Sequence, residues 1–149
     1  MVTKTVTRAL IGICTITSCA VLSVLACAGD AASQSQTSTA KNLLVRDLAG
    51  ASGKEVRMLT VDYRPGGASL PHRHNAQVFV YVLAGSVKMQ VTGSPVVTLG
   101  PGETFYEGPD DVHTVSANAS QTEPARILVV MVRDKNTPLS TEVPPKERP

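Results

Sequence analysis

Short β-type runs separated by turn residues limit the folds open to this chain more than any other feature. From residue 41 to residue 134, runs of four to eight residues rich in β-branched and aromatic side chains alternate with segments containing Gly, Pro, Asn or Asp. The predicted strands are 43–48, 56–63, 78–83, 87–92, 96–99, 104–107, 112–116 and 127–133. Residues 87–92 alternate between apolar and polar, as a half-buried strand does, whereas 78–83 are apolar throughout and are expected to be buried on both faces. No segment has a helical period, so the pattern predicts an all-β sandwich or barrel.

Residues 1–28 have the composition of an export signal. Lys4 and Arg8 precede an apolar stretch that continues to Ala28, and a basic start followed by apolar and small residues is typical of such signals. Two processing routes stay open: cleavage after the Ala-Cys-Ala at 26–28, or lipidation of Cys27 in the lipobox-like 24–27. An uncleaved anchor is the alternative, because about twenty apolar residues can span a bilayer. We therefore predict a periplasmic or secreted protein, lipid-anchored if Cys27 is modified.

The rest of the chain divides by composition. Residues 29–40, mostly Ala, Ser, Gln and Thr, predict a flexible linker, and 135–149, with four prolines and five charged residues, a loose Pro-rich extension. Residues 41–134 form the predicted barrel. All three cysteines lie within 1–28, so the folded part has no disulfide or thiol chemistry. The net charge of +2 excludes a strongly basic nucleic-acid binder.

The three histidines are the candidate functional residues. His72 and His74 are two positions apart in an extended segment, so their side chains point to the same face. His113 begins another predicted strand, and two strands of a small closed sheet can aim imidazoles at one first-row metal ion, which binds nitrogen at about 2.0–2.1 Å. His72, His74 and His113 are therefore candidate ligands of one metal ion. A purely structural barrel with unrelated histidines is the alternative.

Residues 66–85 and 102–118 resemble the two sequence motifs of the cupin superfamily. In the first motif a glycine precedes His-x-His, a glutamate and a closing glycine; in the second a glycine precedes a histidine. The residues in register are Gly66, His72, His74 and Gly85 for the first motif and Gly102 and His113 for the second. The resemblance implies a double-stranded β-helix, or jelly-roll barrel, that often holds one divalent metal ion and is often dimeric, so a homodimer is predicted as well.

The chain departs from the family pattern at the acidic ligand. The glutamate position is occupied by Val78, which cannot bind a metal. Gln77 is a weak candidate, because its amide is neutral and neighbouring positions of a strand face opposite sides. Glu103 and Glu107 flank a short predicted strand and are interpreted as solvated surface charges rather than as a base beside the metal.

Three neutral imidazoles would leave a divalent ion its full charge and open coordination positions, which favours an anionic or chelating small ligand such as a carboxylate or enolate. Imidazole suits Fe, Mn, Ni, Zn and Cu, so the identity of the metal stays open. The family resemblance implies a dioxygenase-like or isomerase-like metal enzyme acting on a small organic acid or enol. The alternative is a non-catalytic module that binds a metal or a small ligand, tethered to a membrane through Cys27.

Overall fold

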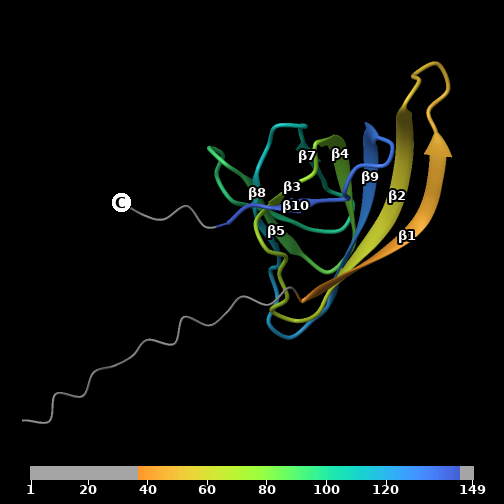
Figure 1. The fold of residues 1–149 in the computed structure, drawn as a ribbon. Coiled ribbons are helices and arrows are strands. Elements are labelled where there is room, and N and C mark those ends of the chain that lie inside the picture. Colours follow the sequence, from red (N-terminus) through yellow and green to blue (C-terminus); the bar gives the residue numbers. More distant parts are fainter. Residues whose placement is uncertain (1–36, 145–149) are drawn as a thin grey trace, which may run out of the picture. The chain divides into compact units, whose positions relative to one another are not determined.

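The structure is a computed structural model that describes residues 37–144 (Figure 1). The predicted export signal and its lipidation site Cys27 lie outside the described residues. Over 37–144 the chain forms ten strands, and we find no helix in this range with the length and apolarity needed to cross a membrane.

The strands form two five-stranded antiparallel sheets. The first has the order β1-β2-β9-β4-β7 and the second the order β10-β3-β8-β5-β6. The strands are β1 (Ser38–Asp47), β2 (Lys54–Tyr63), β3 (His72–Arg73), β4 (Ala76–Ala84), β5 (Val87–Val91), β6 (Val97–Leu99), β7 (Thr104–Glu107), β8 (His113–Asn118), β9 (Ala125–Asp134) and β10 (Thr141–Glu142). The predicted all-β jelly-roll barrel is confirmed.

The turn after β4 depends on Gly85. Its φ of 71° lies in the left-handed region, and a Cβ there would come within 2.4 Å of the Pro124 carbonyl oxygen. Only glycine tolerates both conditions without strain, which explains why this position ends the β4 segment.

An aliphatic core fills the space between the sheets. The inward-facing positions of β4 alternate strictly with exposed ones: Val78, Val80 and Val82 are buried, whereas Phe79, Tyr81 and Leu83 are 43–46% exposed. The expectation that 78–83 are buried on both faces was therefore wrong, because none of the described residues forms a layer over the outer face of this sheet. The buried hydrophobic residues are Leu59, Tyr63, Ala76, Val78, Val80, Val82, Val87, Met89, Ala125, Ile127, Val129 and Met131.

Both ends of the barrel segment extend further than expected. β1 begins at Ser38, inside the predicted linker 29–40. Part of the predicted extension 135–149 forms β10, which pairs with β3, and the Val143 amide donates to the Pro71 carbonyl oxygen at 2.9 Å. A proline-rich segment is compatible with this position because β10 is the edge of its sheet.

Candidate metal centre

Two neighbouring strands bring the three histidines together. His72 in β3 is paired directly with His113 at the start of β8, and His74 follows β3. Residues paired in an antiparallel ladder point to the same side. The ring centroid of His72 lies 4.6 Å from the ring centroid of His74 and 5.2 Å from that of His113.

Backbone carbonyls hold two of the rings in one orientation. The Nδ1–H of His72 donates to the Leu70 carbonyl oxygen at 2.7 Å, and that of His74 donates to the Leu139 carbonyl oxygen at 2.8 Å. Since a carbonyl only accepts, Nδ1 carries the proton in both rings. The Nε2 atom of each neutral ring is then left with a free lone pair.

These two Nε2 atoms face each other at 3.0 Å. Burial lowers the pKa of both His72 and His74, which favours two neutral rings over a shared proton. Two lone pairs at this separation repel each other unless a cation lies between them. A first-row ion bound to both nitrogens at about 2.1 Å, with an angle of about 90° between them, gives this spacing.

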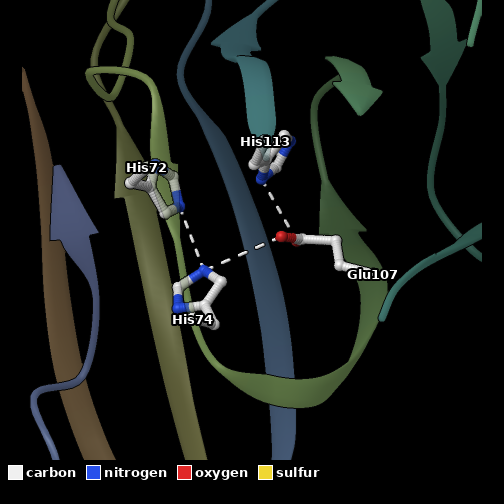
Figure 2. A group of neighbouring side chains, drawn as sticks. All are labelled: His72, His74, Glu107 and His113. Carbon is white, nitrogen blue, oxygen red and sulfur yellow. Dashed lines mark hydrogen bonds and ion pairs between the residues drawn. The ribbon is translucent and has the colours of Figure 1, made fainter. Parts of the chain in front are cut away.

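Glu107 completes the cluster (Figure 2). Its side chain is buried, with Oε1 3.1 Å from Nδ1 of His113 and Oε2 3.8 Å from Nε2 of His74. The interpretation of Glu107 as a solvated surface charge was therefore wrong. Glu107 is the direct cross-strand partner of Val78, so a carboxylate enters the interior one strand away from the family position.

The electrostatics of the cluster favour an ionised carboxylate. Burial raises the pKa of Glu107, but the surrounding imidazoles, His113 first, lower it by more, and the pKa lies below its ordinary value. His113 is only 3% exposed, and neither of its ring nitrogens has a partner with hydrogen-bond geometry among the described residues. One donor atom from each of His72, His74, Glu107 and His113 lies within 4.8 Å of the others. Such a set fits a divalent cation.

The other sequence candidates lie away from this cluster. Gln77 is exposed, because it occupies an outward position of β4 between the buried Ala76 and Val78, so its side chain points away from the core. Glu103 is exposed, and its carboxylate accepts a hydrogen bond from the Gly100 amide at 2.6 Å. The surface interpretation is confirmed for Glu103 alone.

The cluster opens into a cavity of about 120 Å³ between the sheets. About half of its lining residues are apolar, such as Val80, Val129 and Met131, and the rest are polar. Tyr63 and Ser116 also line it, and their hydroxyl oxygens are 2.6 Å apart.

The family comparison agrees with this architecture. Residues 59–131 match the profile of the family described as "Cupin domain". The domain has the cupin fold. The match and the fold together support membership of the cupin superfamily, while no curated protein sequence matches the chain.

Solved structures resemble this chain over most of its length. DMSP lyase DddQ from Ruegeria pomeroyi DSS-3 is 22% identical with a TM-score of 0.58, over 71% of this chain and 51% of that one. An oxalate oxidase in complex with the substrate analogue glycolate is 26% identical with a TM-score of 0.54, over 70% and 54%. The polyketide cyclase RemF from Streptomyces resistomycificus is 21% identical with a TM-score of 0.57, over 76% of both chains. The chain thus spans about half the length of the first two, and the likeness to DddQ and RemF shows the fold alone.

Proposed function

We propose that this cupin binds one divalent metal ion through His72, His74, Glu107 and His113. The observation that carries the proposal is the 3.0 Å approach of two Nε2 atoms whose rings are committed to backbone carbonyls through Nδ1. Three neutral imidazoles and one carboxylate leave a divalent ion a net charge of +1, instead of the +2 expected from histidines alone. Fe, Mn, Ni, Zn and Cu all accept this donor set.

The cavity defines the class of small molecule that we propose as ligand. At about 120 Å³ the cavity is smaller than the pockets of about 300–1,000 Å³ that hold drug-sized ligands, so we propose a small ligand. A net positive ion favours an anionic, chelating group, and the apolar half of the lining favours a short apolar remainder. The oxalate oxidase neighbour holds glycolate, a small carboxylate, which supports this class.

For the reaction, we propose metal-dependent, dioxygenase-like or isomerase-like chemistry on a small organic acid or enol. A bound metal ion would supply Lewis-acid polarisation of the ligand's oxygen atoms or, if redox-active, electron transfer. The chain's own residues orient the site: Leu70 and Leu139 fix two imidazoles through their carbonyls.

A non-catalytic binding module is the second candidate. Glu107 is the one buried carboxylate that contacts the histidine cluster among the described residues, so if it is a metal ligand no second buried carboxylate in this range is left beside the cluster for proton transfer. Turnover separates the two candidates: oxygen uptake or product formation with Fe(II)-loaded protein and a panel of small carboxylates and enols supports the enzyme. Saturable binding of these molecules without turnover supports the module.

Metal content tests the metal-binding proposal directly. Untagged protein should contain stoichiometric metal by elemental analysis, and His74→Ala and Glu107→Gln should contain less. Glu103→Gln is the matched control, because it neutralises an exposed carboxylate four residues from Glu107. Wild-type protein that takes up no divalent metal would refute the proposal.

Export, a lipid tether at Cys27 and a homodimer stay predictions from the sequence. The processing site lies outside the residues that the structure describes.

A further inference from the structure

A strap formed by residues 135–143 runs from the end of β9 to β3, the strand that carries His72, and pairs with it through β10 (Figure 1). The Lys135 amide donates to the Gly53 carbonyl oxygen and the Val143 amide to the Pro71 carbonyl oxygen, each at 2.9 Å. Between these two points, Leu139 lines the cavity and packs against the core. The strap therefore forms part of the wall of the proposed ligand site.

The strap also holds one of the ligands. His74 lies just outside β3, and its Nδ1 bonds to the carbonyl of Leu139, 65 residues further along the chain. This bond keeps the proton on Nδ1 and turns Nε2 towards His72 and Glu107. The tautomer and direction of the His74 ring thus depend on where the strap lies.

A buried arginine fixes the strap. Arg133, at an inward-facing position of β9, is 2% exposed. Its Nη2 donates to the Thr137 carbonyl oxygen, to Thr137 Oγ1 at 2.6 Å and to the Pro138 carbonyl oxygen at 2.8 Å, and its Nε lies 3.5 Å from Glu55 Oε1. A buried guanidinium is costly unless its donors are satisfied; here strap oxygens accept from Nη2, whereas Nη1 has no partner among the described residues.

We propose that Arg133 is a positioning residue for the metal centre. By anchoring Thr137 and Pro138, it places the Leu139 carbonyl where it holds His74 with Nε2 free to bind a metal. The expected effect of Arg133 on metal affinity rests on the proposed function. The expected effect of Arg133 on the His74 tautomer does not depend on a metal. Mutating a residue that supports a metal ligand through hydrogen bonds typically weakens metal affinity by about 10–100-fold.

The first test reads the His74 tautomer in metal-free, full-length protein by ¹⁵N NMR at about pH 8, above the ordinary histidine pKa of about 6.5. The His74 ring signals are assigned as those that are missing from the spectrum of His74→Gln. The wild-type ring should be the Nδ1–H tautomer, and Arg133→Met should give a mixture of both neutral tautomers. Arg126→Met is the matched control, since Arg126 lies on the same strand and is ion-paired, with Asp62, away from the strap.

The second test is the Kd for Zn²⁺. Arg133→Met should weaken it by about 10–100-fold and Arg126→Met by less than about twofold. If Arg133→Met does not fold, Pro138→Gly replaces it, because it loosens the strap and leaves Arg133 in place.

Folded variants that keep the wild-type tautomer, or that change the tautomer without changing the Kd, would overturn the inference. A tautomer change in a protein whose wild type binds no Zn²⁺ would uphold the orientation of His74 by Arg133 and refute the proposed function instead.

Discussion

The pairing of β4 with β7 predicts that the acidic ligand can be moved from Glu107 to the position of Val78. Val78 and Glu107 are direct cross-strand partners, and the Cβ atoms of such a pair lie about 4.5–5.5 Å apart on the same face. A carboxylate at either position therefore enters the interior at nearly the same height. We expect Glu107→Val to lose metal affinity and Val78→Glu/Glu107→Val to recover most of it.

The size of the loss follows from the geometry of the cluster. All donor atoms lie within 4.8 Å of one another, so a cation among them is within about 4 Å of the carboxylate. Two unit charges at about 4 Å attract by about 1 kcal/mol in water and about 4 kcal/mol near a protein surface, and a divalent ion doubles both figures. Because burying the carboxylate offsets part of this attraction, we take about 2 kcal/mol as the expected loss, or about thirtyfold in Kd.

The assay is competition of Zn²⁺ between the protein and a chelator of known affinity. Glu103→Val is the control, since it removes an exposed carboxylate from the same segment. Thermal unfolding of the metal-free proteins checks the fold, and Glu107→Val should be less stable than wild type, because it removes the carboxylate that contacts His74 and His113 and whose pKa those imidazoles lower. The argument is refuted if Glu107→Val binds Zn²⁺ as tightly as wild type, or if the folded double variant binds no better than Glu107→Val.

Three further predictions use other parts of the barrel. Burial raises the pKa of Tyr63, against the opposing effect of its hydrogen bond to Ser116, so in an absorbance titration one of the three tyrosines should ionise above the ordinary value of 10. Its contribution to stability is present below pH 10 and lost at higher pH, and Tyr63→Phe should remove the late phase. Gly85→Ala should lower the melting temperature clearly more than Gly93→Ala. Both glycines have a positive φ, but only at Gly85 would an added Cβ collide with a backbone atom, the Pro124 carbonyl oxygen. Equal shifts in melting temperature would contradict this. A divalent metal at about 100 times its Kd should raise the free energy of unfolding by about 2.7 kcal/mol, which raises the melting temperature by about 10–20 °C. If added metal leaves the melting temperature of the wild-type protein unchanged, the proposed site is absent.

The histidine cluster could be anticipated from the sequence, whereas its carboxylate could not. The spacing of His72 and His74 fixes a common face, and the cupin resemblance supplied His113. Glu107 shares its parity with the half-buried Phe105, which was a usable signal. What the sequence does not contain is the strand partner of β7, and only the pairing with β4 places Glu107 opposite Val78.

Two short strands escaped prediction for a related reason. β3 and β10 have two residues each, too few for a period to be visible. Their pairing depends on contacts between segments about 70 residues apart, such as Thr141 with Arg73. The strap that orients His74 therefore looked like a loose tail. The exposed outer face of β4 was missed because an apolar run looks the same whether or not its outer face is covered.

The site lies where the edges of the two sheets meet, and this location links its parts. β7, which carries Glu107, is the edge of the first sheet and pairs only with β4; β3, which carries His72, is separated from the edge of the second sheet only by β10. Neither β7 nor β3 has a long hydrogen-bonded neighbour on both sides, so the positions of Glu107 and His72 depend on contacts that connect the two sheets. The strap held by Arg133 connects them on one side, and a metal ion bound to Glu107 and the histidines would connect them directly. Strap and metal therefore stabilise the same junction, which is why a buried arginine outside the ligand set can influence how tightly the ion is held.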